Sequence, residues 1–159
     1  PPTTAPAPKS LPAAAAPRSL GTVKIPVKLD YACRILCELA RHYDRGEPLS
    51  IDALSRTEDV PANFLAQILG ELKNGKLVVS RRGAQGGFLL SREPSQITLY
   101  EIVQVMEGDL LELSGNHGGK SGRYLKQIWN DIRAAAADRA KSSTLERMAQ
   151  VHAEANYEI

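Results

Sequence analysis

The sequence predicts a mainly α-helical fold with one small β-hairpin, and three features of the chain lead to this prediction. One is a helical repeat of apolar residues that stops at a glycine, and another is a pair of short apolar runs around a basic, glycine-rich turn. The third is a long helical pattern with a narrow apolar seam late in the chain. Together they predict helices over residues 28–43, 51–56, 61–74, 98–108, 121–141 and 143–150, and a hairpin over residues 77–90.

The most informative stretch, residues 60–90, has the pattern of a helix followed directly by a hairpin. Apolar residues recur at helical spacing on one face of the helix, namely Phe64, Leu65, Ile68, Leu69 and Leu72. The opposite face is small and polar, with Asn63, Ala66, Gln67, Gly70, Glu71 and Lys73. Pro61 suits the first turn, where a missing N–H costs nothing. Gly75 is expected to end the helix in the left-handed conformation.

The hairpin is predicted from two apolar runs, residues 77–79 and 88–90, that flank a turn at residues 81–87. The turn begins with two adjacent arginines and contains three glycines, so its tip is basic and flexible. A polar-faced helix followed at once by a basic hairpin is how a winged helix-turn-helix domain meets a DNA duplex. We therefore predict a winged helix-turn-helix domain.

The residues before this stretch supply the other two helices of such a domain. Residues 28–43 carry an apolar stripe, and Ser50 is placed to cap a short helix at residues 51–56. Residues 57–59 then form the turn into the third helix. The chain accordingly divides into a Pro/Ala-rich extension at residues 1–22, expected to be disordered, a DNA-binding domain at residues 23–97, and dimerisation and regulatory helices at residues 98–159.

Two helix starts in the last part of the chain carry capping boxes. Thr98 pairs with Glu101, and Ser143 pairs with Glu146. Between them lies the long helix at residues 121–141, whose apolar seam consists of Leu125, Ile128, Trp129, Ile132, Ala135 and Ala136. A helix of about 20 residues spans about 30 Å, more than a domain of this size covers. We expect it to cross its twin in a homodimer; the alternative is packing back against its own domain.

Charge and composition narrow the class of protein. Residues 73–92 hold five basic residues and no acid, whereas residues 98–159 hold seven basic and nine acidic residues, so the basic excess is local, as for a phosphate-binding surface. No apolar run is long enough for a transmembrane helix or a signal peptide, and the two cysteines fall within a helical pattern, which predicts a reducing, cytoplasmic location. No catalytic constellation or metal-ligand spacing occurs, so we expect neither an enzyme nor a bound cofactor.

These motifs resemble the Rrf-two family of bacterial winged helix-turn-helix transcriptional regulators, over residues 27–150. The matching segments are residues 30–34, 64–69, 82–88, 97–99 and 107–108. The most specific is Arg82-Gly83-Ala84-Gln85-Gly86-Gly87-Phe88, directly after the third helix. The resemblance implies a homodimer with crossed long helices that binds a partly symmetric DNA operator.

One departure from the family affects the expected cofactor. Cluster-binding members carry three cysteines in the loop after the fourth helix, but residues 109–121 contain none and offer His117 as the only candidate ligand. An iron–sulfur cluster needs thiolates or several imidazoles. Asp30 lies at a position where some members of the family use an acid as a cluster ligand, but this sequence lacks the loop cysteines that would complete such a site. The loop and the final residues look more like the cluster-free, cysteine-metabolism branch, so we expect a cluster-free regulator.

The residues expected to contact DNA lie mainly on the third helix and the wing: Lys28, Ser50, Asn63, Phe64, Gln67, Arg81, Arg82, Gly83, Gln85, Gly86 and Gly87. The amides of Asn63 and Gln67 suit adenine or phosphate contacts, although ordinary exposed helix surface is the alternative. Arg82 holds the family's wing arginine position, which implies minor-groove contact. Phe64 stands where the family has Tyr, and we expect it to be partly in the core.

Cys33 and Cys37 are four residues apart and so share one helix face. They could form a redox pair, but we favour small apolar fillers at positions where the family has leucines, because free cysteine behaves as a buried hydrophobe. The overall prediction is a homodimeric repressor that responds to a protein or small-molecule effector. The alternative is a winged protein-interaction module, for example one that docks onto an enzyme of cysteine synthesis.

Overall fold

The computed structural model of the protein describes residues 24–112 and 115–155, so residues 1–23, with the Pro/Ala-rich extension, and residues 156–159 lie outside the described part. The helices are α1 (Val27–Arg41), α2 (Ile51–Glu58), α3 (Ala62–Asn74), α4 (Leu99–Met106), α5 (Gly119–Ser142) and α6 (Leu145–Ala155). Two strands, β1 (Val78–Arg81) and β2 (Gly87–Leu90), and two 3-10 helices, Tyr43–Arg45 and Pro94–Gln96, complete the described elements. The predicted mainly α-helical fold with one hairpin is confirmed.

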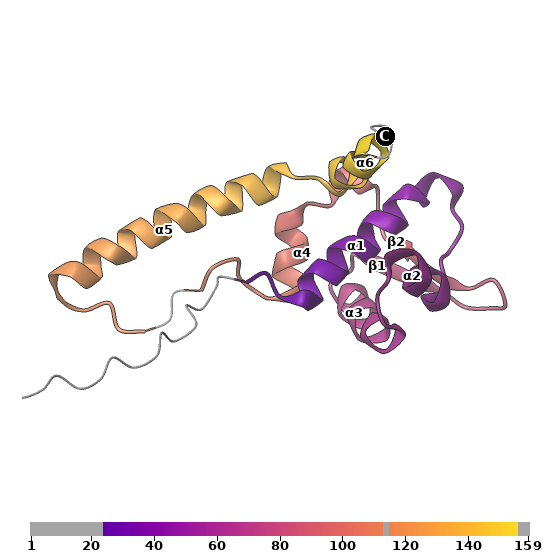
Figure 1. The fold of residues 1–159 in the computed structure, drawn as a ribbon, viewed down its shortest axis with the longest axis horizontal. Helices are drawn as coiled ribbons and strands as arrows, with labels where there is room; N and C mark the ends of the chain where they lie inside the picture. Colours follow the sequence, from indigo (N-terminus) through magenta and orange to yellow (C-terminus); the bar gives the residue numbers. More distant parts are fainter. Residues whose placement is uncertain (1–23, 113–114, 156–159) are drawn as a thin grey trace, which may run out of the picture.

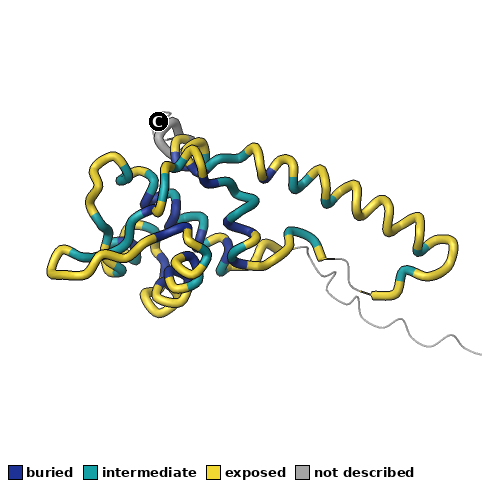
Figure 2. The backbone as a smooth tube through the Cα atoms, turned by 180° about the vertical axis from the view of Figure 1, so that it is seen from behind, coloured by how far each residue is buried: buried dark blue, intermediate teal, exposed yellow. Residues whose placement is uncertain are grey.

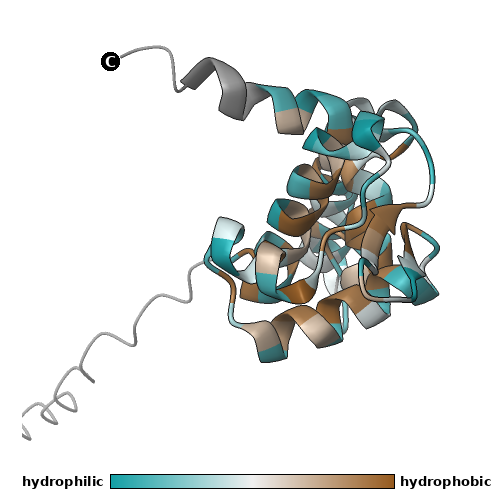
Figure 3. Ribbon diagram, turned by 90° about the vertical axis from the view of Figure 1, so that its right-hand side faces the viewer, coloured by the Kyte–Doolittle hydropathy of each residue, from teal (hydrophilic) through white to brown (hydrophobic). Residues whose placement is uncertain are grey.

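The first three helices pack around one apolar core, and the β1–β2 hairpin projects beyond them (Figure 1). Hydrophobic residues face inward between the helices, as Figure 3 shows. The fully buried side chains of these helices are those of Ile35, Leu36, Leu54, Leu65, Ile68, Leu69 and Leu72. The helical repeat in the sequence therefore identified the core face of α3 correctly, except for Phe64.

Two later helices complete the same core. Helix α4 packs on α1 and α3, and α6 packs on α1. The start of α6 is fixed by backbone pairing with the segment before α4, because the Leu145 N–H donates to the Ile97 carbonyl over 2.7 Å. Leu145 and Ile97 are both fully buried. Thus α4 and α6 are built into the winged domain, although their sequence lies beyond its expected boundary at residue 97.

Helix α5 leaves this core and extends away from it (Figure 1). Its 24 residues correspond to about 36 Å of helix. Figure 2 shows that it is exposed along most of its length. Among the described residues of α5, only Ala140, near the C-terminal end of the helix, is buried. The alternative in which this helix packs back along its own domain is therefore wrong.

Local capping signals set three of the helix starts. Ser50 caps α2, since its hydroxyl accepts the Ala53 N–H over 3.2 Å. The capping box of Thr98 and Glu101 is present in full at the start of α4, with Ile97 and Ile102 both buried. The predicted Ser143 cap is wrong. Thr144 Oγ1 accepts the Arg147 N–H over 3.4 Å instead, and the Ser143 hydroxyl donates to the Arg139 carbonyl.

Gly75 does not adopt the predicted left-handed conformation. Its φ and ψ are −74° and 1°, and Lys76 takes the positive φ of 60°. Glycine suits this position for a different reason, since a Cβ here would lie 2.5 Å from both methyl carbons of Val105 on α4. The end of α3 can therefore approach α4 closely.

The remaining boundaries differ from the predictions by a few residues. Helix α1 ends at Arg41, and a 3-10 turn follows it up to Gly46, whose φ is 63°. Both strands extend further toward the hairpin tip than the apolar runs suggested. Helix α6 continues beyond Gln150. No described helix is long and apolar enough to cross a membrane.

Candidate nucleic-acid interface

The outer face of α3 presents the amide side chains that the sequence predicted. Asn63 and Gln67 lie one turn apart and are both exposed, while Leu65, Ile68 and Leu69 hold the opposite face in the core. Gln67 Nε2 donates to Glu71 Oε1 over 3.3 Å, which orients the Gln67 amide along the helix. The face is therefore polar and accessible, as insertion into a groove of DNA requires.

Phe64 lies at the margin of this face, and its side chain is 47% exposed. Its ring meets that of Tyr31 edge-on, with the centroids 6.3 Å apart. Tyr31 in turn lies under the Arg34 guanidinium, 5.6 Å from the ring centroid. Phe64 is thus half-exposed and fixed against α1, consistent with the expectation of partial burial.

Lys28 reaches α3 from the start of α1. Its Nζ lies 3.0 Å from Glu71 Oε2, and both side chains are about one-third exposed. This pair fixes α1 against α3 and offsets the charge of the one acid on the outer face of α3. The sequence pattern did not reveal the contact, because it joins residues far apart in the chain.

The wing is an antiparallel hairpin that is also hydrogen-bonded to the segment before α2. Its register pairs Val79 with Leu89 and Ser80 with Phe88. Phe88 also exchanges two backbone hydrogen bonds, of 3.0 and 2.9 Å, with Leu49, the residue before the Ser50 cap. The wing is therefore tied to the start of the helix-turn-helix.

Three glycines shape the tip, each in its own way. Gly83 has a φ of 117°, and a Cβ there would meet open space. A Cβ on Gly86 would lie 2.4 Å from the Arg81 carbonyl oxygen, and one on Gly87 would lie 2.4 Å from the Leu49 carbonyl oxygen. Gly86 and Gly87 are thus needed for close backbone packing within the wing, and Gly83 for the turn itself.

The basic residues of α3 and the wing differ in their hydrogen-bond and ion-pair partners. Lys73 Nζ donates to the Ser80 hydroxyl over 2.8 Å, and Arg92 pairs with Glu101 on α4. Among the described residues, no carboxylate lies within ion-pair distance of Lys76, Arg81 or Arg82. Arg81, Arg82 and Gln85 are exposed at the tip. Two of these three basic residues, Arg81 and Arg82, therefore lie exposed at the wing tip without an ion-pair partner among the described residues.

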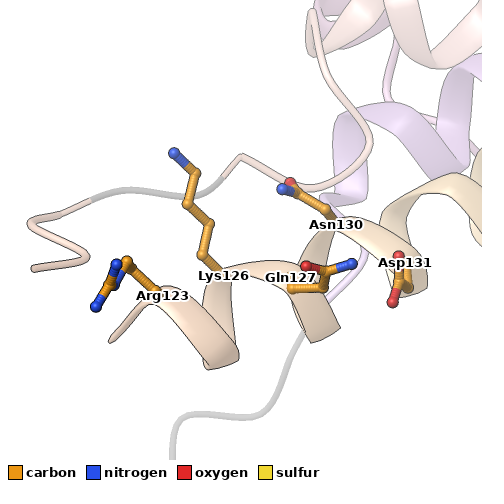
Figure 4. Close-up of a pocket in the computed structure, with 5 residues that line it drawn as sticks. All are labelled: Arg123, Lys126, Gln127, Asn130 and Asp131. Carbon is orange, nitrogen blue, oxygen red and sulfur yellow. The ribbon is translucent and has the colours of Figure 1, made fainter. Parts of the chain in front are cut away.

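The apolar seam of α5 is open to solvent in the single chain. Leu125, Ile128, Trp129 and Ile132 are 51%, 37%, 46% and 45% exposed, and Ala136 is half-buried. The opposite side of the helix is polar, and Figure 4 shows its residues, Arg123, Lys126, Gln127, Asn130 and Asp131. Helix α5 is therefore amphipathic, and its apolar face is uncovered in the single chain.

Cys33 and Cys37 lie half-buried on α1, away from the seam of α5. Burial, with smaller contributions from the nearby Cys37 and Asp30, raises the pKa of Cys33 to about 12. Burial also raises the pKa of Cys37 to about 11, against an opposing effect of Arg41. Both thiols are therefore protonated at neutral pH, in line with the direction expected from an apolar helix.

The loop after α4 does not have the donor set of an iron–sulfur site. His117 is its single imidazole, and its Nε2 atom is buried without a hydrogen-bond partner. The backbone of His117 packs so closely on α5 that a Cβ on Gly122 would lie 2.7 Å from the His117 carbonyl. Nowhere in the described residues do three or more His, Cys, Asp or Glu side chains form a possible metal site. The residues present do not fit a cluster.

Three features define the class of this protein: the exposed polar face of α3, the basic wing, and the turn that joins α2 to α3. Together they identify a winged helix-turn-helix transcriptional regulator that binds DNA. The comparisons with known proteins agree. The Rrf2 family, described as an iron-dependent transcriptional regulator, matches residues 25–151. The chain belongs to the Rrf2 family.

Relatives of known name and structure lie in the same family. The HTH-type transcriptional regulator CymR of Bacillus subtilis is 33% identical over 127 residues, covering 80% of this chain and 90% of CymR. The structure of CymR, described as the global cysteine regulator of B. subtilis, matches with a TM-score of 0.73 and covers 82% of this chain and 98% of that one. IscR of T. potens matches with a TM-score of 0.72 at 28% identity, covering 86% and 93%. These relatives are transcriptional regulators and not enzymes.

Proposed function

We propose that the protein is a homodimeric repressor without an iron–sulfur cluster, which binds a partly symmetric operator in the cytoplasm. In this proposal α3 enters the major groove through Asn63 and Gln67, and Arg82 at the wing tip contacts the minor groove. The single observation that carries the DNA part of the proposal is the unpaired charge of Arg81 and Arg82 beside the exposed amides of α3.

Dimer formation is supported by the seam of α5. The exposed side chains of Leu125, Ile128, Trp129 and Ile132 form one continuous apolar stripe on a helix that leaves the core. A second copy offers a matching stripe by symmetry, as a two-fold interface requires. Two linked copies would also place two recognition helices on successive half-sites, about 34 Å apart.

Because the loop after α4 lacks cluster ligands, we expect a protein or a small molecule as the effector, and oxidation at Cys33 or Cys37 is the third alternative. Genes of cysteine metabolism are the first candidates for the regulon, because CymR of B. subtilis, at 33% identity, is described as the global cysteine regulator. The same likeness supports a cysteine-metabolism enzyme as one partner to test.

The experiment is selection of genomic DNA fragments on the purified protein, followed by sequencing of the retained fragments. We expect enrichment of a short, partly symmetric motif upstream of a few genes. Fluorescence anisotropy on that motif and on a scrambled duplex then gives the ratio of specific to non-specific affinity. No enriched motif, or equal affinity for both duplexes, would reject operator binding and favour a protein-interaction role.

A further inference from the structure

A surface pocket lies between α1, the turn of the helix-turn-helix and α6. It has a volume of about 470 Å³. Its lining includes Cys33 and Cys37 from α1, Thr57 and Glu58 from the last turn of α2, Asp59 after it, and Met148 from α6. The predicted turn at residues 57–59 is therefore wrong at its first two residues, because α2 continues to Glu58. Helices α1 and α6 pack against each other. Both cysteines of the sequence and one of its two methionines therefore meet at one pocket.

The spacing of the two cysteines allows both sulfurs to bind one ion. Residues four apart on a helix share a face, with Cβ atoms about 5–6 Å apart. A metal–thiolate bond is about 2.3 Å long, so two such bonds span up to about 4.6 Å. We propose that Cys33, Cys37 and Met148 form a binding site for a soft monovalent cation, Cu(I). The thioether of Met148, which lines the same pocket, would serve as a weak third ligand.

The ligand set favours Cu(I) over the commoner protein metals. Thiolate and thioether sulfurs select soft cations such as Cu(I). Structural zinc prefers four ligands in a tetrahedron, and the described residues contain no group of three or more His, Cys, Asp or Glu side chains suited to a metal. Glu58, a carboxylate on the pocket wall, is already paired with Arg34 and Arg41.

The proposed binding step balances in atoms and electrons. When two thiols bind one Cu(I), two S–H protons leave to solvent and two Cu–S bonds form, so the bound unit carries one negative charge and no electron is transferred. The guanidinium groups of Arg34 and Arg41 line the same pocket, where both also pair with Glu58.

The test is an anaerobic titration of the full, reduced chain with Cu(I) in competition with a chromogenic Cu(I) chelator. We expect a single Cu(I) per chain to be withheld from the chelator. Cys33→Ser and Cys37→Ser should each weaken binding by more than about 100-fold, and Met148→Leu by about tenfold. Cys→Ala variants serve as a second pair, and circular dichroism checks that each variant is folded.

Met106→Leu is the matched control, because Met106 is the other methionine and is buried on α4 outside the pocket. It should bind Cu(I) as the unaltered protein does. The proposal is overturned if the chelator takes all the copper, or if the cysteine variants bind as tightly as the unaltered chain. Equal losses in Met106→Leu and Met148→Leu would remove Met148 from the site.

Discussion

Gly75, just after the recognition helix α3, lies so close to Val105 of α4 that a Cβ at Gly75 would be 2.5 Å from both Val105 methyl carbons. Gly75→Ala should therefore force α3 and α4 apart and destabilise the fold by about 1–3 kcal/mol. Urea unfolding followed by circular dichroism measures this loss. Val105→Ala in the same chain should restore part of it, because it removes the two methyl groups that clash.

Gly70→Ala is the matched control for this experiment. Gly70 is also on α3, it is exposed, and a Cβ there meets nothing within 4 Å. Alanine in a helix is favoured over glycine by about 0.5–1 kcal/mol, so this variant should be as stable as the unaltered protein or more so. Equal effects of the two substitutions would show that the Val105 contact does not constrain the end of α3.

Arg82→Ala should weaken operator binding with little change in stability, because Arg82 is exposed and unpaired at the wing tip. If Arg82 contacts base edges, the binding free energy should fall by about 1–3 kcal/mol for the operator and should not change for other sequences. If it contacts phosphate, binding should weaken on all sequences and the slope of log K against log salt should fall by about one. Arg139→Ala, which removes an exposed arginine on α5, is the control and should not change the affinity. Unchanged operator affinity in Arg82→Ala would show that the wing tip does not contact DNA.

Features encoded by neighbouring residues could be predicted from the sequence. The capping box of Thr98 and Glu101 and the Ser50 cap depend on contacts three residues apart, and both are present. The core face of α3 followed from helical spacing in the same way. Local patterns thus identified the winged fold, its core and the exposed positions of Asn63, Gln67 and Arg82.

Features that join distant segments could not be predicted. Residues 73–92 hold five basic residues and no acid, but the run itself does not show that Arg92 pairs with Glu101 and that Lys73 bonds to Ser80. The role of Gly75 depends on Val105, and the pocket beside Cys33 depends on Met148 of α6. Each contact is set by how helices pack, which a single sequence pattern does not specify.

Ile132→Glu should convert the protein to monomers, because it places a charge in the apolar seam of α5. Such monomers should bind the operator weakly, since two half-sites need two linked recognition helices. Size-exclusion chromatography with light scattering measures the mass. Gln127→Glu, which adds a negative charge on the polar face of the same helix, should leave the dimer intact. A dimeric Ile132→Glu protein would place the interface elsewhere.

Native Cys33 and Cys37 should react slowly with oxidants and alkylating agents at neutral pH. The thiolate is the reactive form. A pKa raised from 9.0 to about 11 lowers the thiolate fraction of Cys37 about 100-fold, and the larger rise to about 12 lowers that of Cys33 about 1,000-fold. Because the pKa values are raised, the rate should increase with pH until it approaches them. Mass spectrometry after timed iodoacetamide pulses measures the rate, and the protein unfolded in urea serves as the reference for unperturbed cysteines.

Because the thiols of Cys33 and Cys37 should react slowly, replacing both cysteines with Ser should leave any response to peroxide in the cell largely unchanged. If the double variant still bound the operator but no longer released it under peroxide, α1 would be identified as a redox switch.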